Sequence, residues 1–313
     1  MNFRTFIGAV IIAVILVGSG FFAGRETAPQ SKDTETTNSS TSYPLLSKRL
    51  FIEDPNDTLL NFVPLRQELN TYFESNKLQG SLYFEYLPTG TSIRIDGDRM
   101  EVAASLMKLP LAMELYKAQE QGSIDLNSKI TLQEGWLDGA YGSLYKKGAG
   151  YSLTLKEAAE IMLKESDNTA LKAIANATQD KIAASNRVFN YLDIEITQNY
   201  DLTVSMSAKS YSSILKCLYF SCYLNKDHSE ELLSYLTESA FNDRLVAGIS
   251  DNIKVAHKIG VVSETNQSDC GIIYLNKRNY TLCIMLNGPD DGSLNPHFKA
   301  LSKKTYDYLK SLQ

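Results

Sequence analysis

Residues that bind metals or redox groups are scarce in this chain of 313 residues. It has three histidines and four cysteines, the latter at Cys217, Cys222, Cys270 and Cys283. The cysteines form no Cys-x-x-Cys pair and have no histidine at the spacing of zinc ligands. They are also too few for a disulfide-stapled scaffold. We therefore expect no metal site and no cofactor.

An excess of basic residues is lacking as well. The chain has 31 Lys and Arg against 36 Asp and Glu, so its formal net charge is −5. Nucleic-acid binders usually carry a concentrated basic face, and we expect no such partner here. What is present is 43% hydrophobic and 21% charged residues. This composition supports a packed core and excludes wholesale disorder.

A long uncharged apolar run occurs once, at residues 6–24, between Arg4 and Arg25. At 1.5 Å per residue a helix of this length spans about 28 Å, close to the thickness of a bilayer core. We expect a transmembrane anchor, with residues 1–5 in the cytoplasm and the rest of the chain outside it. Small residues near the end of the run also fit a cleaved signal peptide, in which case the protein would be secreted.

Residues 25–58 are polar and rich in Ser, Thr and Asn, which predicts a solvated linker. Globular patterning begins near residue 59, and residues 59–313 are assigned to one folded domain. Two cysteines, Cys270 and Cys283, fall on strands that we predict to be neighbours. No pairing follows from the sequence, however, and we expect free buried thiols.

Hydrophobic spacing predicts the order of elements in the folded domain. Apolar residues at helical spacing from 63 to 73 predict an opening helix, and strands at both ends of the domain enclose a mostly helical middle. The last helix is predicted to begin with Asn295 as cap and Pro296 in the first turn. The expected strands are 81–87, 91–96, 253–258, 271–275 and 280–286; the expected middle helices are 105–119, 155–165, 170–177 and 181–192.

The strands at the two ends of the domain must come together to form one sheet. We therefore expect an α/β (α+β) fold, with an antiparallel sheet flanked by the N- and C-terminal helices. An all-helical lobe is inserted between the strands, and a cleft separates it from the sheet.

The tetrad Ser-x-x-Lys occurs three times, at Ser105/Lys108, Ser143/Lys146 and Ser213/Lys216. Residues three apart on a helix are neighbours, so the amine can take the hydroxyl proton if burial or a nearby cation lowers its pKa. Ser105 is favoured because it begins a predicted helix, where free backbone N–H groups suit an oxyanion. The second copy lies in a glycine-rich loop, and the third lies on a predicted surface helix that no other element approaches.

Two more motifs follow in order along the chain. Ser166-Asp167-Asn168 ends a predicted helix, and Lys258-Ile259-Gly260 ends a predicted strand. Alone, the first could be a capping turn and the second a strand-end charge facing water. Ser-x-x-Lys, Ser-Asp-Asn and Lys-x-Gly in this order resemble the serine β-lactamases and penicillin-binding proteins, most closely the class A β-lactamases. The resemblance covers about residues 60–313.

The resemblance implies a catalytic role for four side chains. Ser105 would be the acylated nucleophile, and Lys108 the amine that activates it. Ser166, helped by Lys258, would pass a proton to the leaving nitrogen. Physical reasoning agrees, because two ammonium groups close together disfavour each other, which pushes one amine toward its neutral, basic form.

The resemblance also implies the residues that bind substrate. Asn168 would hold the amide side chain of the substrate, and Gly260 belongs to the strand that lines the site. The backbone N–H groups of Ser105 and Val261 would form the oxyanion hole.

Two departures from the family pattern bear on the reaction. Class A β-lactamases carry an acidic residue that activates the water for deacylation, and in the corresponding stretch of this chain, residues 192–202, Glu195 is the nearest candidate for that base. It alternates with Ile194 and Ile196, which predicts an exposed strand position instead. Ile259 replaces the usual Thr or Ser and cannot donate a hydrogen bond to a substrate carboxylate. We therefore expect acylation without rapid antibiotic hydrolysis.

We therefore expect an extracytoplasmic active-site-serine hydrolase that cleaves a β-lactam or related cell-wall amide through an acyl-enzyme. One alternative is a penicillin-binding D-Ala-D-Ala carboxypeptidase-like enzyme that deacylates slowly. Another is a non-catalytic surface module that binds peptidoglycan. The expected partners are thus a small β-lactam or a D-Ala-D-Ala-type peptide, together with a membrane through residues 6–24.

Overall fold

The computed structural model describes residues 60–178, 186–199, 203–262 and 265–312. The predicted cytoplasmic end, apolar run and linker, at 1–5, 6–24 and 25–58, lie outside these residues. Within the described part of the chain, no helix is both long and apolar enough to cross a membrane.

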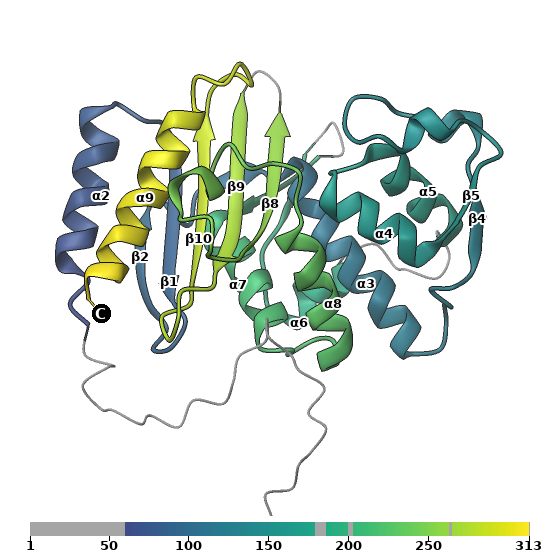
Figure 1. Ribbon diagram of the computed structural model, residues 1–313, viewed down its shortest axis with the longest axis horizontal. Coiled ribbons are helices and arrows are strands. Elements are labelled where there is room, and N and C mark those ends of the chain that lie inside the picture. Colours follow the sequence, from purple (N-terminus) through teal and green to yellow (C-terminus); the bar gives the residue numbers. More distant parts are fainter. Residues whose placement is uncertain (1–59, 179–185, 200–202, 263–264, 313) are drawn as a thin grey trace, which may run out of the picture. The chain divides into compact units, whose positions relative to one another are not determined.

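A five-stranded antiparallel sheet forms the centre of the domain. Strands from both ends of the chain meet in it, as predicted, because β1 pairs with β10 along its whole length. Figure 1 shows the strands side by side. Their order is β2 (Thr91–Ile95), β1 (Gly80–Tyr86), β10 (Tyr280–Asn287), β9 (Asn266–Ile273) and β8 (Val255–Val262).

Alternation of side chains along each strand builds a separate core on each face of the sheet. On β10, Leu282 and Ile284 pack with the terminal helices α2 (Val63–Ser75) and α9 (Asn295–Ser311). Cys283 and Met285 belong to the core on the opposite face, which includes the inserted lobe. Figure 1 shows α2 and α9 together on one side of the sheet. The predicted flanking of the sheet by the terminal helices is confirmed.

The inserted lobe consists mainly of helices. They are α3 (Lys108–Glu120), α4 (Leu155–Lys164), α5 (Asn168–Thr178), α6 (Asn186–Tyr191), α7 (Ala208–Tyr219) and α8 (Lys226–Thr237). The lobe also contains short strands, which the expectation of an all-helical lobe left out. β4 (Lys129–Thr131) pairs with β5 (Ser152–Thr154), and β7 (Val204–Ser207) lies between β3 (Met100–Val102) and β6 (Thr197–Gln198).

Two helices begin differently from the prediction. The helix expected at 105–119 begins with the 3₁₀ turn Ala104–Met107, and α-helix proper starts at Lys108. Asn295 is the first residue of α9 and not its cap; its amide donates to Asp243 at 2.6 Å instead. The part of the predicted 181–192 helix before residue 186 lies outside the described residues.

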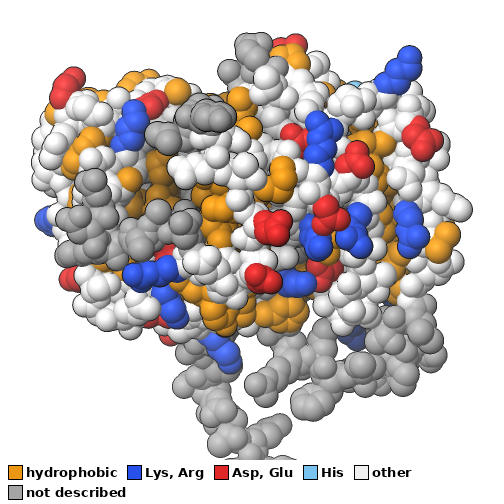
Figure 2. Space-filling view, turned by 180° about the vertical axis from the view of Figure 1, so that it is seen from behind, with side chains coloured by type: hydrophobic (Ala, Val, Ile, Leu, Met, Phe, Trp, Pro, Cys, Tyr) orange, Lys and Arg blue, Asp and Glu red, His pale blue; other side chains and the backbone are white. Residues whose placement is uncertain are grey.

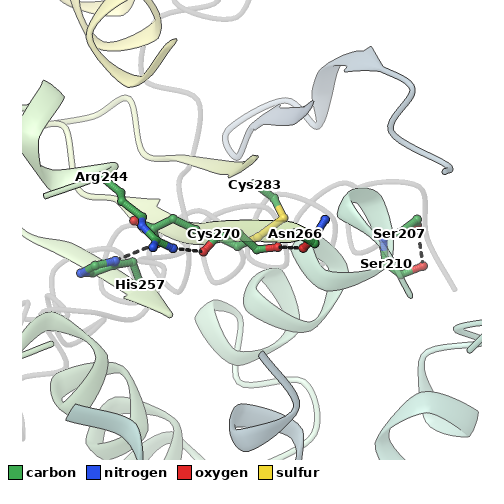
Figure 3. The surroundings of a disulfide bond; sticks show 9 residues. Ser207, Ser210, Arg244, His257, Asn266, Cys270 and Cys283 are labelled. Carbon is green, nitrogen blue, oxygen red and sulfur yellow. Dashed lines mark hydrogen bonds and ion pairs between the residues drawn. A yellow bond between two sulfur atoms is a disulfide. The ribbon is translucent and has the colours of Figure 1, made fainter. Parts of the chain in front are cut away.

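All four cysteines are paired, so the expectation of free thiols was wrong. Cys270 and Cys283 stand directly opposite each other in the register of β9 and β10, which brings their side chains to the same face. Cys217, in the last turn of α7, pairs with Cys222 just beyond the helix. Figure 3 shows the buried Cys270–Cys283 bond and its surroundings.

Charged side chains of both signs are scattered over the face seen in Figure 2. Lys and Arg side chains stand among Asp and Glu side chains over that face. For the described residues that it shows, opposite charges close together limit the field that either sign can build.

Candidate active site

The turn that carries Ser105 is held in a strained backbone conformation. Ala104, one residue earlier, has φ +46°, a left-handed value that costs a non-glycine residue about 1–3 kcal/mol. Strand β8 approaches this turn closely at Gly260. A Cβ at Gly260 would lie 2.8 Å from the carbonyl oxygen of Ala103. Glycine is therefore what allows β8 to lie against the turn.

Lys108 lies at the centre of the site, with 1% of its surface exposed. Its Nζ donates to the Oγ of Ser105 at 3.0 Å and to the Oγ of Ser166 at 3.2 Å. It also donates to the Oδ1 of Asn168 at 2.7 Å and to the backbone carbonyl of Ser166. One amine thus connects the first and second motifs.

Ser166 lies in the short loop between α4 and α5, and it is fully buried with φ +54°. Asp167 stabilises this loop by accepting from the backbone N–H groups of Leu144 at 2.8 Å and Ala170 at 2.7 Å. Gly142 permits the contact, because a Cβ there would lie 2.0 Å from the Asp167 carboxylate. The motif is therefore a buried turn whose serine faces both lysines.

Lys258 is an interior residue of β8, which corrects the expectation that it ends a strand. The strand continues to Val262 because its pairing with β9 extends to the Val262–Asn266 pair. Lys258 is 1% exposed, so it does not face water. Its Nζ donates to Ser166 Oγ at 2.8 Å and to the carbonyl oxygen of Ile259 at 3.1 Å.

Burial makes both amines weaker bases than an ordinary lysine. It lowers the pKa of Lys108 to about 8, and the nearby Asp167 and Asp138 carboxylates oppose this only in part. Burial, followed by the positive charge of Lys108, holds the pKa of Lys258 well below its usual value. Burial is therefore the main cause for both amines, and the repulsion between ammonium groups inferred from the sequence contributes at Lys258.

A cavity of about 420 Å³ opens beside Ser105. Its lining comes from the Ser105 turn, the loop before α4, the start of α5 and β8; it includes Ser105, Lys108, Tyr141, Asn168, Leu171 and Val261. This volume suits a small ligand.

A second cavity, of about 460 Å³, lies at the other end of α3. Its charged groups are already paired with one another. Glu120 is 2.9 Å from His228, and Lys156 is 2.6 Å from Glu231. Residues of the first two sequence motifs line the cavity at Ser105, and the described lining of this second cavity includes no motif residue.

The other two Ser-x-x-Lys copies have different partners. Ser143 donates to Glu165 at 2.6 Å. In the third copy, Lys216 forms an ion pair with Glu85 of β1 at 2.8 Å. Its helix, α7, packs against β1, β9 and β10, so the expectation of a surface helix that no element approaches was wrong.

The two departures noted in the sequence have clear positions. Glu195 is exposed between half-buried Ile194 and Ile196, as the alternation predicted, and it lies just before β6. Ile259 is buried at 2% exposure. Within the described residues, the Ser105 hydroxyl forms a hydrogen bond with Lys108 and with no carboxylate.

Sequence reasoning missed Arg244, a buried cation near the site. Its Nη2 donates to Gln267 Oε1 at 2.9 Å and to Asp290 Oδ1 at 3.0 Å. Its charge contributes to lowering the pKa of Lys258, which places it near that amine. Figure 3 shows its side chain beside the sheet that carries Cys270. No motif or periodicity singles it out in the sequence.

Comparisons with known proteins bear on the family and the fold. Residues 64–309 match the sequence profile of a family described as the beta-lactamase enzyme family. A beta-lactamase from Bacillus licheniformis is 24% identical over 243 residues, which cover 72% of this chain and 77% of that protein.

Solved structures share the fold at low sequence identity. PBP-A matches with a TM-score of 0.72 at 22% identity, covering 80% of this chain and 97% of that one. A PBP-A mutant in an acyl-enzyme complex with penicillin G gives 0.71 at 24% identity, covering 79% and 97%. A beta-lactamase from Chitinophaga pinensis gives 0.70 at 19% identity, covering 79% and 99%.

Proposed function

Because the chain belongs to the beta-lactamase enzyme family, we propose that it forms an acyl-enzyme through Ser105 with a β-lactam. The observation that carries the proposal is the position of the Lys108 amine, 3.0 Å from the Ser105 hydroxyl and 3.2 Å from that of Ser166. A buried amine of lowered pKa at this distance is suited to general-base activation of a serine.

In the acylation step, neutral Lys108 accepts the Ser105 proton while Oγ bonds to the carbonyl carbon of the lactam. The carbonyl oxygen becomes an oxyanion, which the backbone N–H groups of Ser105 and Val261 would stabilise. The position of Val261 supports this role, because Val261 lines the same cavity as Ser105. Each donor of this kind contributes about 3 kcal/mol to transition-state stabilisation.

The leaving nitrogen then needs a proton as its bond to carbon breaks. Ser166 is the proposed donor, because its hydroxyl accepts hydrogen bonds from both Lys258 and Lys108. When Ser166 gives its proton to the nitrogen, Lys108 returns to it the proton taken from Ser105. The relay then ends with no proton gained or lost, and Lys258 stabilises the transient alkoxide on Ser166.

Two further side chains would position the substrate. Asn168 donates to Asp138 at 3.3 Å and accepts from Lys108, so its amide is held at the cavity wall, where it would contact the substrate amide. Arg244 would bind the substrate carboxylate, which Ile259 cannot do.

Slow deacylation is part of the proposal. Hydrolysis of an acyl-enzyme requires a base beside the ester, and Glu195 is exposed in front of β6. In the described part of the chain, no carboxylate bonds to the Ser105 hydroxyl. The same features favour a second candidate function, a D-Ala-D-Ala carboxypeptidase-like enzyme of the cell wall. A non-catalytic peptidoglycan-binding module has less support, because it needs no amine beside a serine.

We further propose that the domain works outside the cytoplasm, anchored by residues 6–24 or released as a secreted protein. Two observations support this. The uncharged apolar run is long enough to span about 28 Å as a helix, and both cysteine pairs form disulfides, which persist in oxidising compartments.

Intact mass after incubation with penicillin G tests the proposal. We expect a gain of one penicillin mass that persists over hours, and no gain in Ser105→Ala. Rapid loss of the adduct would instead indicate efficient β-lactamase turnover. If the unaltered protein never gains the mass, the acyl-enzyme proposal is wrong and the binding module becomes the better explanation.

A further inference from the structure

Asp290 connects the two sides of the proposed site. It lies in the loop between β10 and α9. Its carboxylate accepts hydrogen bonds from two side chains that belong to different parts of the domain. The hydroxyl of Tyr141 donates to Oδ2 at 3.0 Å, and Nη2 of Arg244 donates to Oδ1 at 3.0 Å. Tyr141 belongs to the inserted lobe, whereas Arg244 contacts β9 of the sheet. The carboxylate is therefore a polar bridge between the inserted lobe and the residues packed on the sheet.

The bridge adjoins the cavity that contains Ser105. Tyr141 lines that cavity, and its backbone carbonyl accepts from the N–H of Asn168 at 3.1 Å. Burial and the hydrogen bond to Asp290 raise the pKa of Tyr141 to about 12. Since the phenol keeps its proton at neutral pH, it continues to donate to Asp290.

Arg244 is already occupied by a carboxylate. Its side chain is 6% exposed, and that of Asp290 is 33% exposed. A guanidinium recognises any carboxylate by the same planar geometry. The more exposed partner in this ion pair can therefore be exchanged for the carboxylate of a ligand while Arg244 stays in place.

We propose that Asp290 is an internal competitor for the carboxylate of the substrate. It neutralises Arg244 in the free enzyme, so a carboxylate-bearing substrate must displace it before gaining the charge interaction. Asp290 thereby reduces the advantage of an anionic substrate over an uncharged one. This inference rests on the proposed function, because it concerns which substrates reach Ser105.

Penicillin G and its methyl ester provide matched probes, because they differ at the carboxylate. The second-order rate constant of acylation is measured by mass spectrometry on the full chain. We expect Asp290→Asn to raise it about tenfold for penicillin G and less than about twofold for the ester. Tyr141→Phe is the control: it breaks the bridge but keeps the Arg244–Asp290 ion pair, so both probes should change in parallel.

The outcomes separate the two proposals. If the unaltered chain is acylated but Asp290→Asn changes both probes equally, or neither, the competitor role is wrong and the proposed function stands. If neither probe acylates the unaltered chain, the proposed function itself fails. Thermal unfolding checks that each variant is folded, and Asp290→Ser replaces Asp290→Asn, with the same expectation, if the latter is not.

Discussion

The Nζ of Lys258 lies 2.8 Å from the hydroxyl of Ser166, although 92 residues separate them in the chain. The Nζ of Lys108, from the Ser-x-x-Lys motif, lies 3.2 Å from the same hydroxyl. One buried oxygen therefore contacts two amines, each with a lowered pKa. This shared contact ties the two lysines into one proton-relay unit, and changes at either are expected to affect both steps of acylation.

Replacing Ser105 by Ala should abolish acylation, with a fall of about a thousandfold or more in the rate of penicillin labelling. The two other Ser-x-x-Lys copies supply matched controls. Ser143→Ala and Ser213→Ala each remove the serine hydroxyl from one of the other two copies of the tetrad and leave the cavity at Ser105 intact. Both should be labelled at the unaltered rate, as measured by intact mass. Full labelling of Ser105→Ala would assign the nucleophile elsewhere.

The acylation rate should rise with pH between 7 and 9. The base form of Lys108 is the neutral amine, and its pKa is lowered to about 8. The neutral fraction therefore increases about tenfold over this interval, from about one in eleven to about ten in eleven. Stopped-flow labelling across this range measures the profile. Lys108→Arg, which stays charged throughout, should lose both the activity and the rise; a flat profile in the unaltered protein would contradict Lys108 as base.

Much of the fold follows from local patterns in the sequence. The Thr154–Glu157 capping box that opens α4 depends on residues three apart, and both of its reciprocal hydrogen bonds are present. The opening helix, the two strands predicted at 81–87 and 91–96, and the meeting of the end strands in one sheet match the prediction. These features depend on residues close in sequence or on hydrophobic periodicity, which a single sequence displays.

What the sequence could not reveal depends on contacts between distant segments. The expected strand stopped at Lys258, two residues before Gly260, whereas β8 continues to Val262. In the structure, Gly260 is the glycine that lets β8 pass the turn before Ser105. Arg244 and Asp290 lie 46 residues apart and outside every motif, so their ion pair has no local signal.

Gly260→Ala should disturb the nucleophile more than the fold. The added Cβ would meet the Ala103 carbonyl at 2.8 Å, and that backbone can yield only by moving the turn that carries Ser105. We expect a loss of about 1–3 kcal/mol in the free energy of unfolding. The variant should stay folded, and its acylation rate should fall by more than this loss of stability explains. Gly135→Ala is the matched control, because a Cβ there meets nothing within 4 Å. If Gly260→Ala is acylated normally, the close approach of β8 does not position Ser105.

The two disulfides should differ in their contribution to stability. Cys270–Cys283 spans 13 residues of sequence and Cys217–Cys222 spans five. In the chain-entropy account, the longer loop gives about 3 kcal/mol and the shorter about 2 kcal/mol. Cys270–Cys283 also lies fully buried between β9 and β10, on the sheet face that carries Lys258, because Cys270 stands opposite that residue.

Paired Cys→Ala variants at each bond, compared by urea unfolding at neutral pH, measure this difference. We expect the Cys270/Cys283 variant to unfold at lower urea and to lose acylation before global unfolding, because β9 supports the strand that holds Lys258. The Cys217/Cys222 variant should lose stability and activity together. The opposite order of midpoints would show that the bond at the end of α7 constrains the domain more than the one inside the sheet.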